Sequence, residues 1–73
     1  MREEIKEIIK QVLQIEQVKD NISRENCEKW DSLNHLNLIV ALEIKYDESF
    51  EPDEIVEMRS LEDIVQMLTA KKG

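Results

Sequence analysis

The first fifteen residues carry apolar side chains at a helical spacing. These side chains form one continuous stripe at positions i, i+3, i+4, i+7 and i+8, namely Ile5, Ile8, Ile9, Val12 and Leu13. Acidic residues dominate the first turns, where they complement the positive end of a helix dipole. The pattern predicts a helix from about Arg2 to Ile15.

Residues 16–30 show no sustained apolar period and mix charged residues with amides and a serine. A connection of this length in a small domain must cross it from one end to the other, and long connections are often functional. We expect Val18, Ile22 and Trp30 to anchor the segment on the core.

The next segment begins at Asp31 or Ser32, both favourable residues for a helix N-cap, and is apolar around much of its circumference. Its apolar residues are Leu33, Leu36, Leu38, Ile39, Val40, Leu42, Ile44 and Tyr46. A helix apolar over so wide an arc is either central to a bundle or has an exposed strip for a partner.

Pro52 ends this pattern and favours a short third helix over Asp53–Met58, with Ile55, Val56 and Met58 on its apolar side. Ser60 then predicts the N-cap of a fourth helix, because Asp63 follows three residues later as in a capping box. The apolar stripe of this last helix is Leu61, Ile64, Val65 and Leu68. We therefore predict that residues 1–73 form a single all-α domain, a four-helix bundle with a long first loop and a short third helix.

Charge narrows the range of partners. The net charge is −7, and residues 31–73 hold 10 acidic and 4 basic side chains. Six acidic residues and no basic residue lie between Asp47 and Glu57. Such a field repels nucleic acid and attracts basic protein surfaces, although a run of acids can also serve only as a solvated face.

The single cysteine, Cys27, cannot form an internal disulfide, and no segment approaches the ~18 apolar residues that span a bilayer. The N-terminal residues lack the apolar core of a signal peptide. We therefore expect a cytoplasmic monomer that does not insert into membranes. A Cys27–His35 nucleophilic pair lacks an orienting third group, and a lone histidine near a helix start is more often solvated or capping. Residues 47–58 fail as a calcium loop because Pro52 and Met58 replace an essential glycine and glutamate, so no metal site is expected.

The triplet Asp31-Ser32-Leu33 resembles the phosphopantetheine attachment motif of acyl carrier proteins. The residues that follow keep the family spacing over about Trp30 to Leu68, including the segment Leu38–Glu43, Tyr46, Phe50, Pro52, Asp53, Glu54, Met58, Ser60, Leu61 and Asp63. The resemblance implies an acyl-carrier-type bundle that is not an enzyme. In such a protein Ser32 bears a covalent 4'-phosphopantetheine arm, donated from coenzyme A by a magnesium-dependent transferase, and the arm holds acyl groups as thioesters.

The same resemblance assigns the residues around the attachment point. Asp31 and Leu33 would flank the arm, and Asp31 fits a helix cap, a contact with the transferase, or both together. Leu33, Val40, Glu43 and Ile44 would contact partner enzymes that have basic docking patches. Leu38, Leu42, Ile55 and Met58 would line a pocket for the acyl chain. A phosphate on Ser32 would lie at the positive end of a helix, and the sequence offers no dedicated basic pocket for it.

Some residues depart from the pattern of fatty-acid carriers. Asn34, His35, Asn37 and Ile44 stand where those carriers place acidic or small polar residues. The combination Trp-Asp-Ser-Leu-x-His is similar to that of stand-alone carriers from specialised biosynthetic clusters. An aminoacyl or peptidyl carrier and a non-carrier helical adaptor, which would bind partners independently of Ser32, remain alternatives.

Overall fold

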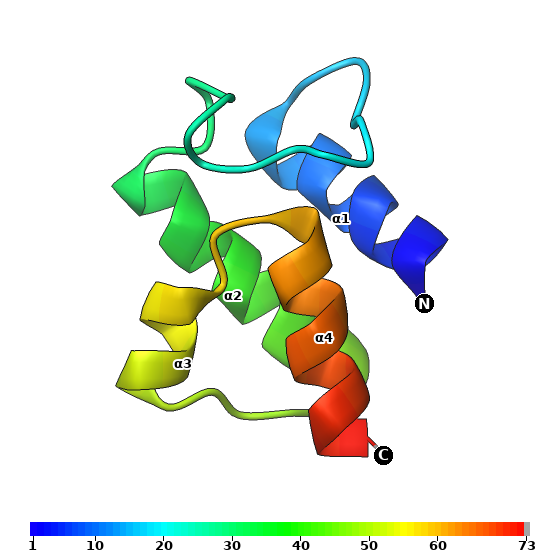
Figure 1. Ribbon diagram of the computed structural model, residues 1–73, viewed down its shortest axis with the longest axis vertical. Coiled ribbons are helices and arrows are strands. Elements are labelled where there is room, and N and C mark those ends of the chain that lie inside the picture. The colour runs from blue at the N-terminus through cyan, green and yellow to red at the C-terminus, as the bar shows by residue number, and fades with distance from the viewer. Residues whose placement is uncertain (73) are drawn as a thin grey trace.

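The computed structural model describes residues 1–72, of which Lys72 only by its backbone. It contains α1 (Arg2–Leu13), α2 (Ser32–Tyr46), α3 (Pro52–Glu57) and α4 (Leu61–Lys72), in agreement with the predicted all-α bundle. Helix α1 packs against α2 and α4, while the short α3 lies at the far side of α2 (Figure 1). The connection 14–31 runs across one end of the bundle, as expected from its length (Figure 1).

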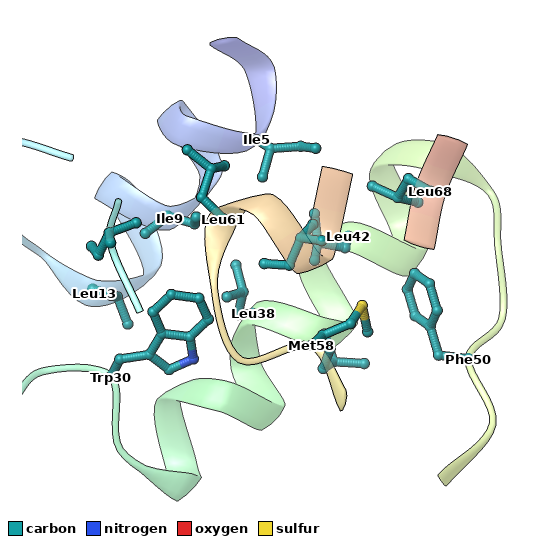
Figure 2. Close-up of a cluster of buried hydrophobic side chains, with 13 residues drawn as sticks. Ile5, Ile9, Leu13, Trp30, Leu38, Leu42, Phe50, Met58, Leu61 and Leu68 are labelled. Carbon is teal, nitrogen blue, oxygen red and sulfur yellow. The ribbon is translucent and has the colours of Figure 1, made fainter. Parts of the chain in front are cut away.

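The core lies where these elements converge. Side chains from α1, α2 and α4 point into one interior with Trp30, Phe50 and Met58 (Figure 2). The buried apolar residues are Ile5, Ile9, Leu13, Ile22, Trp30, Leu38, Ile39, Leu42, Phe50, Met58, Leu61, Ile64 and Leu68. The predicted stripe of α1 and the anchoring roles of Ile22 and Trp30 are confirmed, and Val18 packs against the core while half-buried. Cys27 is also a half-buried packing residue.

Two helix boundaries differ from prediction. Helix α1 ends at Leu13 rather than Ile15, because Gln14 adopts the left-handed conformation (φ 57°) that closes a helix C-terminus. Helix α3 spans Pro52–Glu57 rather than Asp53–Met58, since proline is well suited to the first helical position. Glu51 caps α3, and its backbone N–H donates to Glu54 Oε1 over 2.8 Å in a capping box.

The apolar side of α3 is narrower than predicted. Val56 is exposed, whereas Ile55 is half-buried and Met58, just beyond the helix, is buried. At the start of α4, Ser60 Oγ accepts the Asp63 N–H over 3.0 Å, as predicted. The reciprocal bond of a capping box is displaced by one residue, because Asp63 Oδ2 accepts the Arg59 N–H rather than that of Ser60.

Backbone contacts fasten the 14–31 connection to the segment between α3 and α4. Ser23 and Ser60 form an isolated antiparallel bridge. The Leu61 N–H donates to Ile22 O over 3.1 Å, and the Arg24 N–H donates to Arg59 O over 2.9 Å. These bonds hold the residues around Arg24 at the same end of the bundle as the beginning of α2.

Candidate functional site

Ser32 is exposed and is the first residue of α2. The preceding Asp31 has an extended backbone, and its Oδ1 accepts the Asn34 N–H over 2.9 Å. This is the N-cap arrangement that Asp31 favours, and it leaves the Ser32 side chain available to solvent. The first turn of α2 contains no acidic residue. An anion attached to Ser32 would therefore meet the positive end of the helix dipole without an acid in that turn to oppose it.

A second layer of contacts fixes the chain as it enters α2. Asn34 Nδ2 donates to Lys29 O over 2.8 Å, which ties the first turn of the helix to the end of the connection. The His35 N–H donates to Asp31 O over 2.8 Å. Trp30, only 2% exposed, is packed in the core immediately before the N-cap residue Asp31. The orientation of Ser32 is thus set by a packed aromatic residue on one side and a capped helix on the other.

Arg24 contacts the hydroxyl of Ser32 directly, a contact that sequence reasoning missed. Its Nη2 donates to Ser32 Oγ over 3.4 Å. The sequence led us to expect no dedicated basic pocket for a phosphate at this site, and the fold of the 14–31 connection adds one guanidinium, eight residues away in sequence, beside the serine. Residues 16–30 lack a periodic pattern, so the sequence contained no signal for this contact.

His35 is buried, contrary to the expectation of a solvated or capping histidine. Only 4% of it is exposed, and Trp30 Nε1 donates to its Nδ1 over 3.0 Å. Its Nε2 lies 2.8 Å from the carbonyl oxygen of Ile55. Because Nδ1 accepts a hydrogen bond, a neutral ring with its proton on Nε2 satisfies both contacts. His35 thereby links the connection, α2 and α3, and it makes no contact with Cys27 among these bonds.

An apolar strip runs along the outside of α2. We call Leu33, Leu36, Val40 and Ile44 the α2 strip; all four are exposed, Ile44 by 78% and Leu33 by 69%. Their spacing of three, four and four residues places them on one helix face. Sequence reasoning selected Leu33, Val40 and Ile44 as partner contacts but not Leu36. The wide apolar arc of this helix predicted either a central position in the bundle or an exposed strip for a partner, and the α2 strip is such an exposed strip.

Glu43, also selected as a partner contact, is half-buried and has an internal role. Its Oε2 accepts the Phe50 N–H over 3.0 Å, which closes the loop after α2. Nearby, Tyr46 Oη donates to Glu4 Oε1 over 3.0 Å and joins α2 to α1. Burial, followed by the hydrogen bond to Glu4, raises the pKa of Tyr46 to about 12.

The four residues selected for an acyl pocket lie in or against the core. Leu38, Leu42 and Met58 are completely buried (Figure 2), and Ile55 is half-buried and packs against the core. Surface hollows occur elsewhere, one of them beside Ile15, Ile22 and Cys27. An acyl chain that reached Leu38, Leu42 and Met58 would have to separate side chains that are in contact here.

Over residues 1–72 the structure brings together no group of three or more metal-ligating side chains. No helix in the same part of the chain has the length and apolar character needed to cross a bilayer. No buried side-chain polar atom of those residues lacks a hydrogen-bond partner.

Comparison with known proteins points to one fold. No protein-family model matches the sequence, and no curated protein matches it significantly. The structure is similar to the solution NMR structure of a holo acyl carrier protein from Geobacter metallireducens, with a TM-score of 0.84 and 28% sequence identity. The match covers 96% of this chain and 83% of the other. This likeness confirms the all-α fold of the acyl-carrier type, and it supports an acyl-carrier-like family and a carrier role.

Proposed function

We propose that this chain is a single-domain acyl carrier protein whose Ser32 bears a 4'-phosphopantetheine arm. The observation that carries the proposal is the exposed Ser32 hydroxyl at the first residue of α2, on a bundle similar to a holo acyl carrier protein. In this proposal the chain catalyses nothing itself and is a substrate of partner enzymes. It works in the cytoplasm as a monomer.

The loading reaction would be a phosphoryl transfer to Ser32. The Ser32 oxygen forms a new ester bond to the phosphorus that bears the pantetheine group of coenzyme A, and the pyrophosphate P–O bond of coenzyme A breaks. Adenosine 3',5'-bisphosphate leaves, and a base on the transferase takes up the hydroxyl proton. The chain therefore needs an accessible hydroxyl rather than its own general base, which agrees with the exposed position of Ser32.

The residues around Ser32 fit the arm. Asp31 caps α2 by accepting the Asn34 N–H, which fixes the helix N-terminus at which Ser32 lies. Leu33, the next residue, is exposed to solvent. The bound arm would supply a terminal thiol, to which a carboxylic acid cargo is linked as a thioester. Leu38, Leu42, Ile55 and Met58 would line a chain-binding space only if the closed core separates around a long cargo.

Partner enzymes would dock on the α2 strip and the acidic surface near it. Leu33, Val40 and Ile44 offer exposed apolar area, and the acidic segment 47–57 would attract basic patches on a phosphopantetheinyl transferase and on acyl-loading or acyl-processing enzymes. Glu43, which is half-buried, would join the margin of this surface. The same negative field disfavours nucleic acid as a partner.

The test is loading of the purified chain with coenzyme A, magnesium and a broad-specificity phosphopantetheinyl transferase, followed by intact mass. We expect a gain of one phosphopantetheine group in the parent protein, and none in Ser32→Ala. Ser49→Ala is the matched control, because Ser49 is an exposed serine outside the site, and it should load as the parent does. A folded parent protein that gains no mass would contradict the carrier proposal and favour the helical adaptor. Trapped aminoacyl cargo on native protein would instead favour an aminoacyl or peptidyl carrier.

A further inference from the structure

Arg24 places a guanidinium against the atom that the proposed function modifies. Its Nη2 donates to Ser32 Oγ over 3.4 Å. Among residues 1–72, Arg24 forms no ion pair with a carboxylate. The adjacent Glu25 is occupied by Arg59, whose hydrogen bond is the main cause of the lowered pKa of that glutamate. The positive charge of Arg24 is therefore not neutralised by its sequence neighbour.

The backbone of Arg24 is held in place before any arm is attached. Its N–H donates to Arg59 O over 2.9 Å, and Ile22 O accepts the Leu61 N–H over 3.1 Å. Asn26 adds a local tie, since its Oδ1 accepts the Ser23 N–H over 3.0 Å. Arg24 is a half-buried residue, and a guanidinium on a fixed backbone loses less conformational freedom on binding than one on a mobile loop.

Loading changes the charge that Arg24 faces. The new ester on Ser32 is a phosphodiester with one negative charge, placed next to the carboxylate of Asp31. That carboxylate already accepts the Asn34 N–H, and it would repel a second anion. Guanidinium groups bind phosphate oxygens through two parallel N–H donors, so Arg24 is chemically suited to offset this repulsion.

We propose that Arg24 binds the phosphodiester of the loaded arm and fixes the root of the arm against the 14–31 connection. This inference rests on the proposed function, because it requires an arm on Ser32. It makes Arg24 a phosphate-binding and positioning residue rather than a catalytic one. It also predicts that the arm leaves the protein on the side of Arg24 and away from the acidic segment 47–57.

The experiment compares loaded wild-type protein with Arg24→Gln, Arg24→Lys and a control, Lys29→Gln. Lys29 is an exposed cation of the same connection for which no ion pair and no side-chain contact with Ser32 is seen within residues 1–72, so its substitution removes the same charge and keeps the Arg24 contact. Intact mass first establishes loading of each protein. The ³¹P resonance of the diester is then measured in native protein and in urea-unfolded protein, where the diester has no folded neighbours. Side-chain Nε–Hε resonances are followed for Arg24, with Arg2 and Arg59 as internal references.

We expect native wild-type and Lys29→Gln to show a ³¹P displacement from the unfolded reference. Arg24→Gln should lose at least half of it, and Arg24→Lys should lie between. The Arg24 Nε–Hε resonance should move on loading while those of Arg2 and Arg59 do not. Salt raised from about 0.05 M to about 0.5 M should move the wild-type ³¹P resonance toward that of Arg24→Gln.

Equal ³¹P displacement in wild-type and Arg24→Gln, or an Arg24 resonance that does not respond to loading, would overturn the inference and leave the carrier function standing. The wild-type measurement keeps the test valid even if Arg24→Gln folds poorly. Failure of folded wild-type protein to gain mass would instead remove the carrier function itself. The two failures are therefore distinct.

Discussion

The buried Trp30–His35 hydrogen bond is expected to make the two residues energetically coupled. We consider His35→Leu, which replaces the ring by an apolar side chain and removes the acceptor of Trp30 Nε1 and the partner of Ile55 O. Trp30→Phe removes the donor and leaves His35 Nδ1 buried without it. The double substitution removes both members of the bond at once.

The magnitude follows from what each variant leaves behind. An unsatisfied buried polar group costs about 1–3 kcal/mol. His35→Leu leaves two such groups unsatisfied, Trp30 Nε1 and Ile55 O, and gains about 1–2 kcal/mol from burial of the leucine side chain. The net loss of unfolding free energy is about 2 kcal/mol. Trp30→Phe leaves His35 Nδ1 unsatisfied and also loses packing of the larger ring, so the unfolding free energy should fall by about 2–4 kcal/mol. Each single variant leaves one member of this bond unsatisfied, at about 1–3 kcal/mol, and the double variant leaves neither, so it should be at least about 2 kcal/mol less destabilised than the sum of the two single variants.

The assay is urea unfolding followed by helical circular dichroism, since Trp30→Phe removes the single tryptophan. Equal m-values across the four proteins would show that the unfolding free energies are comparable. Asn37→Leu adds an exposed leucine to the same helix as a control and should change the free energy by less than about 0.5 kcal/mol. Additivity of the two single variants within about 0.3 kcal/mol would refute the reasoning.

Three further results are expected. Leu33→Asn should leave the urea midpoint nearly unchanged but slow transferase loading about tenfold, whereas Val56→Asn, an equally exposed apolar residue on α3, should load normally; equal loading rates would remove Leu33 from the docking surface. Phenolate absorbance should give Tyr46 a pKa of about 12 in folded protein, and Glu4→Gln should lower it; since the folded pKa is raised, the stability it contributes is complete below pH about 10 and is lost as pH rises toward about 12, so a midpoint near 10 in folded protein would contradict the burial of this group. The capping hydrogen bond from the Glu51 N–H and the ion pair with Lys71 lower the pKa of Glu54, so Glu54→Gln should speed amide exchange in α3 at pH 7, and this difference should shrink as the pH falls through the lowered pKa and the parent carboxylate is itself protonated; unchanged exchange at pH 7 would argue against the cap.

The sequence was sufficient for the helices because their apolar residues keep a helical period. Ile5, Ile9 and Leu13 repeat every four residues and lie buried on α1 as predicted. Asp31 and Ser32 are residue types that favour helix N-termini, so their position could also be predicted, and the structure shows both where expected. Local rules of this kind depend on neighbours within one or two turns, which a single sequence contains.

The missed features depend on contacts between distant segments. Arg24 reaches Ser32 because the aperiodic connection is fastened to the segment before α4, a pairing that no local pattern indicates. His35 did carry a signal, since it stands at i−3, i−4 and i−7 from the buried Leu38, Ile39 and Leu42. Its burial could have been predicted from that register, although its partners Trp30 and Ile55 could not.

Peptide-level mass spectrometry of the loaded protein tests the central claim most directly, because the chain offers four serines and one threonine as possible acceptors. The account predicts that the phosphopantetheine group is found on the peptide containing residues 30–36 and that fragmentation assigns it to Ser32. Modification of Ser23, Ser49 or Ser60 in place of Ser32, or a folded chain that carries no modification after exposure to transferase and coenzyme A, would contradict it.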